Sequence, residues 1–184
     1  MSVYDGVPAV LLSAGPSADY TAAASAVTTA QSLMVGQTYQ PIIPAGYLQP
    51  GKIGSAVVGY AAGKVTGQAT ATTMIVTLTL GTTQGSAGGT TLAASGAVTV
   101  TSLSAAGWEL DFKILQRATS GGSANCTLQC SGVFSAGTGQ ATSPPVSVTL
   151  DPTLNQYLFM QVTFSTASAT NSATLQQFVA YGMA

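Results

Sequence analysis

The chain has 184 residues, which is enough for one domain with a substantial core and too few for two. Only 5% of the residues are charged, whereas about 25% are charged in an ordinary soluble domain. Four lysines and arginines cannot form a basic footprint for nucleic acid. No stretch reaches the roughly 18 uninterrupted apolar residues of a membrane span, and the N-terminus lacks a signal-peptide pattern. We therefore expect no nucleic acid and no membrane among the partners.

So little charge leaves the surface poorly protected against association, because repulsion between like charges keeps free proteins apart. With only 5% of its residues charged, a free monomer would expose large apolar patches to water. We expect partners to cover much of the surface, first of all further copies of the chain in a homo-oligomer.

The composition also argues against catalysis. The chain contains no histidine, which is the residue most often recruited for acid–base and nucleophilic chemistry near neutral pH. The glycine-rich segments 85–89 and 137–139 lack the lysine and the helix start of a phosphate-binding loop. We expect no enzymatic activity, no cofactor and no metal site.

Residues 1–36 differ from the rest and are interpreted as an extended N-terminal arm. Pro8, Gly15 and Pro16 prevent a regular helix through its apolar part, and β-branched residues weaken the alternative of a short helix over 21–30. The arm is too apolar for a free tail, so we expect it to bind a partner. The candidate binding residues are Val3, Tyr4, Val7, Pro8, Val10, Leu11 and Leu12. The alternative is that the arm adds an edge strand to its own domain.

Residues 37–184 are predicted to form one all-β domain. Short runs of β-forming residues separated by glycine-rich turns are typical of an antiparallel sandwich and not of βαβ units. The runs lie at 37–43, 53–60, 72–80, 90–101, 108–117, 125–134, 146–150, 157–164 and 174–181. They make eight or nine strands, and eight antiparallel strands in two sheets is the number found in a jelly roll.

The run 108–117 is the strongest strand signal, because apolar and charged residues alternate along it. One face carries the residues expected at the centre of the core, namely Trp108, Leu110, Phe112 and Ile114. Their burial would contribute about 1.5–3 kcal/mol for each side chain. The other face carries Glu109, Asp111, Lys113 and Arg117. Glu109 and Asp111 could form a catalytic carboxylate pair, but a ladder of ion pairs on a solvated or subunit-facing surface is the interpretation preferred here.

The two cysteines, Cys126 and Cys130, belong to a predicted strand that follows the turn at 120–122. Four residues along a strand span about 13 Å, which is beyond the reach of a disulfide bond. We expect two free, buried thiols.

Five segments resemble small jelly-roll virion proteins of tailed bacteriophages. They are IPAGYLQPGK (43–52), TLTLG (77–81), WELDF (108–112), RATSGG (117–122) and VTFSTASATNSATLQQF (162–178). The similarity lies in their order and spacing, covers about residues 37–181 and leaves the arm outside.

The resemblance implies an oligomeric β-sandwich, often a trimer, that decorates a capsid or sits on a tail, and it carries over no catalytic residues. The expected function is therefore that of a capsid decoration protein, which binds the major capsid protein or other virion subunits and stabilises the shell. It would be made in the host cytoplasm and reside in the virion, on the capsid surface rather than the tail. The alternatives are a tail or fibre component that contacts a host receptor and a carbohydrate-binding module.

Overall fold

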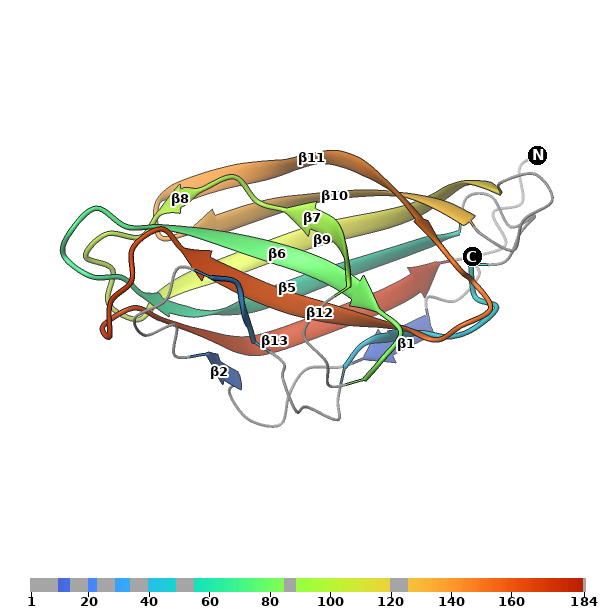
Figure 1. Ribbon diagram of the computed structural model, residues 1–184, viewed down its shortest axis with the longest axis horizontal. Coiled ribbons are helices and arrows are strands. Elements are labelled where there is room, and N and C mark those ends of the chain that lie inside the picture. Colours follow the sequence, from blue (N-terminus) through green and yellow to red (C-terminus); the bar gives the residue numbers. More distant parts are fainter. Residues whose placement is uncertain are drawn as a thin grey trace, which may run out of the picture.

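The computed structural model describes residues 10–13, 20–22, 29–33, 40–48, 55–84, 89–119 and 126–183. No described residue is helical, and every strand pair is antiparallel. Two sheets face each other and enclose one hydrophobic core (Figure 1). The prediction of an all-β antiparallel sandwich is confirmed.

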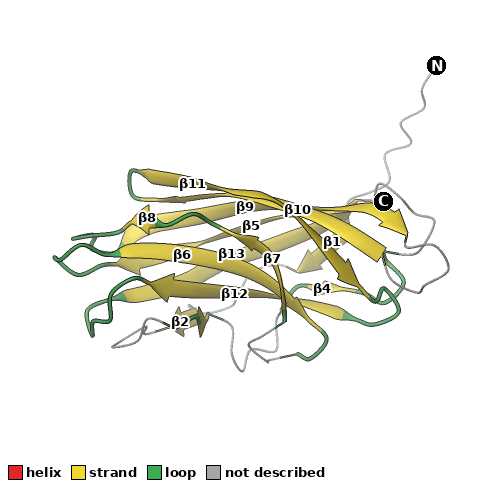
Figure 2. Cartoon of the chain, turned by 45° about the horizontal axis from the view of Figure 1, so that its top comes forward, coloured by secondary structure: helices red, strands yellow, loops and turns green. Residues whose placement is uncertain are grey.

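The larger sheet has the strand order β1 (Val10–Ser13), β13 (Ser172–Met183), β5 (Ala56–Thr66), β9 (Ala106–Thr119), β10 (Cys126–Ala136) and β11 (Gly139–Leu150), with β2 (Tyr20–Ala22) also paired to β13. The smaller sheet has the order β3 (Gln31–Ser32), β12 (Gln156–Phe164), β6 (Thr73–Gly81) and β7 (Thr90–Ala94). In this sheet β4 (Ile42–Ile43) pairs with β12, and β8 (Val98–Thr99) pairs with β6. Figure 2 shows the two layers and the loops that join them.

The strand pairing is nested along the chain. β5 pairs with β13 and β6 pairs with β12, so the beginning of the sandwich lies beside its end. Between these pairs, β9, β10 and β11 follow one another as a meander in the larger sheet. From β5 onward the chain changes sheets between β5 and β6, between β8 and β9, between β11 and β12, and between β12 and β13.

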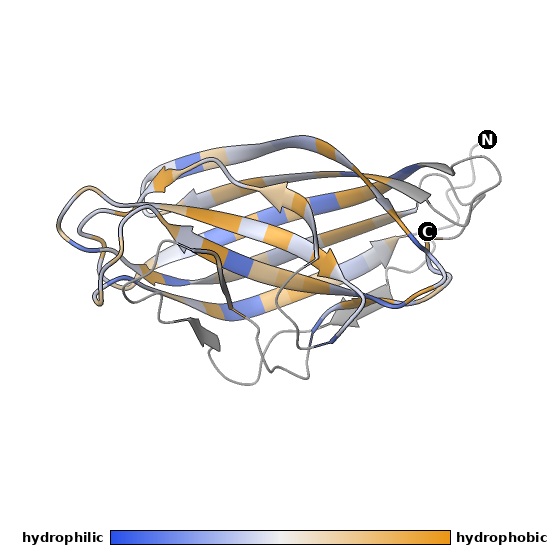
Figure 3. Ribbon diagram, in the orientation of Figure 1, coloured by the Kyte–Doolittle hydropathy of each residue, from blue (hydrophilic) through white to orange (hydrophobic). Residues whose placement is uncertain are grey.

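Strand β9 lies at the centre of the larger sheet and supplies the middle of the core. Trp108, Leu110, Phe112 and Ile114 are each at most 4% exposed. The alternation of polar and apolar residues along the strands is visible as alternating colours in Figure 3. Because successive side chains of a strand point to opposite faces, the charged residues of β9 lie on the outer face of this sheet.

Glycines of β5 make room for the aromatic rings of β9. Gly59 stands opposite Phe112, and Gly63 stands opposite Trp108. A Cβ atom on Gly59 would lie 2.1 Å from the Phe112 ring, and one on Gly63 would lie 2.9 Å from Trp108 Nε1. The rings therefore occupy the space in which the β5 side chains would otherwise lie.

The described part of the N-terminal segment pairs with the body of its own chain. β1 and β2 pair with β13, and β3 pairs with β12. Val3, Tyr4, Val7 and Pro8 lie outside the described residues, while the backbone of Val10, Leu11 and Leu12 belongs to β1. Of the two alternatives for the arm, the addition of edge strands to its own domain is therefore present in β1, β2 and β3.

Strand β11 is longer than the sequence indicates. The sequence predicted a strand only over 146–150, and Pro144 and Pro145, which are rarely found inside a sheet, lie just before it. In the structure β11 begins at Gly139 and is the edge strand of its sheet. An edge strand tolerates proline because one row of its backbone groups has no ladder partner, and the register between β10 and β11 shifts at this point.

Candidate functional site

The outer face of the larger sheet carries the most distinctive group of side chains in the described structure. Glu109, Asp111 and Lys113 project from β9 on this face and are exposed. Beside them the sheet forms a shallow cavity of about 400 Å³, here called the outer pocket. It is lined by Tyr60, Ala62 and Gly63 of β5, Gly107, Trp108 and Glu109 of β9, Ser135 and Gly137 at the end of β10, and Gln176 and Gln177 of β13.

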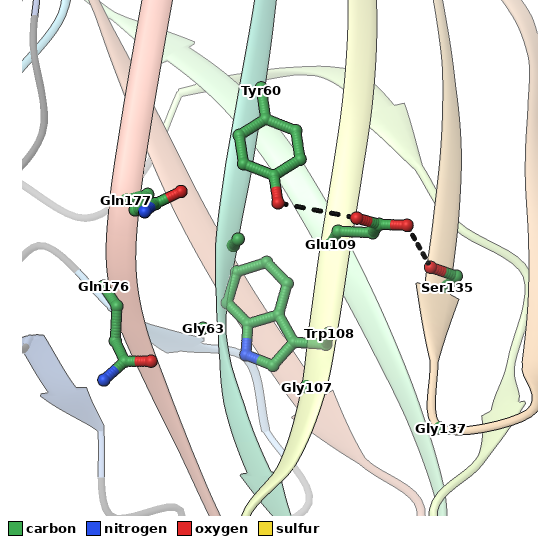
Figure 4. Close-up of a pocket in the computed structure, with 10 residues that line it drawn as sticks. Tyr60, Gly63, Gly107, Trp108, Glu109, Ser135, Gly137, Gln176 and Gln177 are labelled. Atoms are coloured by element: carbon green, nitrogen blue, oxygen red, sulfur yellow. Dashed lines mark hydrogen bonds between the residues drawn. The ribbon is translucent and has the colours of Figure 1, made fainter.

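Glu109 is the centre of the polar side chains in the outer pocket. The Tyr60 hydroxyl donates a hydrogen bond to Glu109 Oε2 at 3.4 Å, and the Ser135 hydroxyl donates one to Oε1 at 3.1 Å (Figure 4). Ser135 stands directly opposite Glu109 on β10, whereas Tyr60 stands opposite Asp111 on β5. Hydroxyl groups on the two neighbouring strands thus bind the carboxylate. The interpretation preferred from the sequence was a ladder of ion pairs along β9.

Tyr60 remains a hydrogen-bond donor across the neutral pH range. Partial burial raises the pKa of its hydroxyl, and the charge and hydrogen bond of Glu109, together with the charge of Asp111, raise that pKa further. Each of these effects disfavours the phenolate, because it would lose solvation and meet negative charge.

A β-bulge in β13 places two consecutive glutamines at the pocket. Leu175 pairs with Gly63 and Gln177 pairs with Ala62, so Gln176 is an extra residue relative to β5. A bulge interrupts the alternation of faces, and both Gln176 and Gln177 line the outer pocket while Leu175 and Phe178 are buried. Two carboxamides therefore lie on the same side of the strand.

The floor of the pocket is nearly free of side chains. Gly63, Gly107 and Ala62 present mostly backbone, and the Trp108 ring lies beneath them in the core. Trp108 Nε1 donates to the carbonyl oxygen atoms of Thr174 at 3.0 Å and Lys64 at 3.2 Å. The indole N–H thereby ties β9 to both β13 and β5 directly below the pocket.

The geometry does not favour a catalytic pair. Glu109 lines the outer pocket, but Asp111 belongs to a separate depression with Val133 and Ser131. Within the described ranges, no three acidic or cysteine side chains are grouped closely enough to hold a metal ion. What the pocket offers is a set of hydrogen-bonding groups around one oriented carboxylate.

The sequence pointed to Glu109 and Trp108 but to none of the other side chains that supply hydrogen bonds to the pocket. Tyr60, Ser135 and Gln177 are brought together by the register of four strands, which local patterns do not specify. One local signal was present. The order Leu175, Gln176, Gln177, Phe178 breaks the alternation of a strand, as a bulge does.

Cys130 is a free thiol that is buried in the core, and burial raises the pKa of this thiol to about 12. Because the thiolate is the reactive form, we expect a Cys126→Ser variant to resist a thiol reagent at mildly alkaline pH until it unfolds. Adding Ser131→Cys supplies a matched control, because Ser131 is adjacent to Cys130 and only partly buried. Fast labelling of Cys130 in the folded Cys126→Ser protein would contradict its burial.

No protein-family model matches the chain, and no curated protein matches it in sequence. In the part of the chain that the structure describes, no helix is long and apolar enough to cross a membrane. Fold and geometry together define a two-sheet β-sandwich with a polar pocket on the outer face of its larger sheet.

Proposed function

We propose that the chain is a non-enzymatic structural protein of a tailed-phage virion, which binds the capsid surface as a homotrimer and stabilises the shell. The observation that carries this proposal is an exposed apolar end of the outer face of the larger sheet. Tyr181 is 42% exposed and Met183 is 39% exposed. The half-buried Val58 and Val179 lie beside them. These four residues are called the apolar end.

The apolar end lies on a chain with very little charge, which supports a role in association. Apolar side chains grouped on one face commonly mark protein–protein contacts. A subunit that binds the folded, assembled shell but not its loosened forms stabilises the shell by mass action. The major capsid protein is the proposed partner, and other virion subunits are further partners.

The jelly-roll assignment is part of this proposal, and the nested pairing of β5 with β13 and β6 with β12 supports it. A long hairpin rolled into two sheets pairs its first strand with its last and its second with its second-last. The hairpin of β9 and β10 takes the innermost position of such a roll. β11 continues the larger sheet beside β10, and its Ser143 hydroxyl accepts a hydrogen bond from the Ala94 N–H of β7 in the smaller sheet.

Substitution in the apolar end tests the proposed association. We expect Tyr181→Lys to convert a trimer into a monomer at micromolar concentration, because it places a charge in an apolar contact. Light scattering measures this, and particles carrying the wild-type protein should withstand heating better than particles mixed with the variant. Leu154→Lys is the matched control, because Leu154 is 48% exposed but lies in the loop between β11 and β12 and is not one of the four residues of the apolar end.

A stable wild-type monomer would overturn the trimer. If particles with and without the protein disassemble at the same temperature, the protein does not stabilise the shell. Its role would then be display or attachment to the host. Cryo-electron microscopy of intact particles would then show whether the protein lies on the capsid or on the tail. A location on the tail would favour the alternative function, contact with a host receptor.

Two truncations separate the proposed anchoring role of the arm from its structural role. Removing residues 1–9 leaves β1 and β2 in place, so we expect normal folding and trimer formation but loss of particle binding. Removing residues 1–22 also strips β1 and β2 from the edge of β13, and we expect a lower midpoint of urea unfolding. Normal particle binding after removal of residues 1–9 would show that Val3, Tyr4, Val7 and Pro8 are not the anchor.

A further inference from the structure

We propose that the outer pocket binds a neutral sugar, a pyranose ring held through its hydroxyl groups. This inference goes beyond the proposed virion function, because it assigns a ligand to a pocket that none of the four residues of the apolar end lines. The pocket borders the apolar end at Val179, which pairs with Tyr60, whereas Tyr181 and Met183 lie farther along β13.

The hydrogen-bonding groups match a sugar hydroxyl, which both donates and accepts. The carboxamide of Gln177 and the hydroxyl groups of Tyr60 and Ser135 are able to do either, and the Glu109 carboxylate accepts. Glu109 uses part of its accepting capacity on Tyr60 and Ser135. The remaining lone pairs are held in a fixed orientation, so a ligand hydroxyl meets an acceptor that is already positioned.

The shape of the pocket suits a flat ring. A Cβ atom at Gly107 would meet nothing within 4 Å, so this part of the floor is open. Figure 4 shows one face of the Tyr60 ring, with its hydroxyl directed at Glu109. An aromatic face packs well against the C–H groups on one face of a pyranose. The volume of about 400 Å³ falls in the range of pockets for small ligands.

The charges argue against ionic ligands. Among the described residues, Glu109 is the only charged side chain that lines the outer pocket, so a phosphate, sulfate or carboxylate would meet repulsion and would find no cation among the lining side chains. A cationic ligand would meet a single carboxylate already bonded to two hydroxyl groups. Lys64 stands opposite Gly107, outside the residues that line the pocket, and its charge would add repulsion for such a ligand. A neutral polyhydroxylated ligand uses every polar group without an unpaired charge.

The isolated protein can be titrated with methyl glycosides of glucose, galactose, mannose and N-acetylglucosamine, and with arginine methyl ester as a cationic probe. Trp108 is the only tryptophan and lies beneath the pocket, so its fluorescence reports occupancy. Amide NMR spectra provide a second readout at Gln176 and Gln177. We expect saturable binding of at least one glycoside, with a dissociation constant in the millimolar range that is usual for a single sugar.

Substitutions then assign the site. Glu109→Gln keeps the size of the side chain and is expected to weaken binding about ten-fold or more, because a hydrogen bond to a charged group is lost. Tyr60→Ala should abolish binding, and Tyr60→Phe should retain part of it. Asp111→Asn removes the same charge from the same face two residues along β9 and should change affinity less than about two-fold.

The proposal is overturned if no glycoside gives a saturable change by either readout. It is also overturned if Asp111→Asn weakens binding as much as Glu109→Gln, or if arginine methyl ester binds more tightly than every glycoside. Urea midpoints show that each variant is folded. Particle binding by Glu109→Gln should remain normal, so this test fails or succeeds independently of the proposed virion role.

Discussion

Trp108→Ala is expected to lower the free energy of unfolding by about 3–5 kcal/mol and to leave the protein insoluble or unfolded. The substitution empties a site that is 2% exposed and packs against the Phe134 ring, with ring centroids 6.3 Å apart. It also removes the donor shared by the carbonyls of Thr174 and Lys64. Urea unfolding followed by far-ultraviolet circular dichroism measures the loss.

Trp108→Phe is the matched control for this variant, because it keeps an aromatic ring in the core while removing the indole N–H. We expect it to lose less stability than the alanine variant. A soluble Trp108→Ala protein with the wild-type urea midpoint would contradict the central position of Trp108 in the core.

Gly63→Ala is expected to destabilise the protein by about 1–3 kcal/mol or more, although alanine is the smallest side chain that can be added. The new Cβ atom would lie 1.7 Å from the Thr174 carbonyl oxygen and 2.8 Å from its carbonyl carbon. These are backbone atoms of the neighbouring strand, so no side-chain rotation relieves the overlap. β5 and β13 would have to separate where Trp108 joins them.

Gly107→Ala is the control for Gly63→Ala, because a Cβ atom at Gly107 meets nothing within 4 Å. Both residues line the outer pocket, so the pair distinguishes a clash with backbone from a general effect of alanine at this site. Equal urea midpoints for the two variants would show that the close approach at Gly63 is not rigid.

The sequence was sufficient to predict those features that depend on local alternation. From Trp108 to Ile114 the period of two places alternate residues on opposite faces, and the buried face of β9 follows from it. Local signals failed where tertiary position overrides propensity. Pro144 and Pro145 are tolerated because β11 is an edge strand, and Gly59 and Gly63 lie inside β5 because rings of β9 fill their space.

The outer pocket could not be predicted from the sequence, for a different reason. Its polar contacts join Glu109 to Tyr60 and Ser135, which lie 49 and 26 residues away in the chain. Such contacts depend on the register of neighbouring strands, and a slip of one residue would turn each side chain to the other face. The amino-acid pattern within one strand contains no information about that register.

The pairing of β5 with β13 has a consequence for synthesis and folding. The Lys64 N–H donates to the Thr174 hydroxyl across 110 residues of chain, so the larger sheet cannot close until its last strand has left the ribosome. Topologies dominated by such distant contacts fold slowly, on the order of milliseconds to seconds. During that interval the edge of β5 remains open to pairing with other nascent chains. Production of this protein at high levels should therefore be limited by aggregation during translation, and slower synthesis at lower temperature should increase the soluble yield.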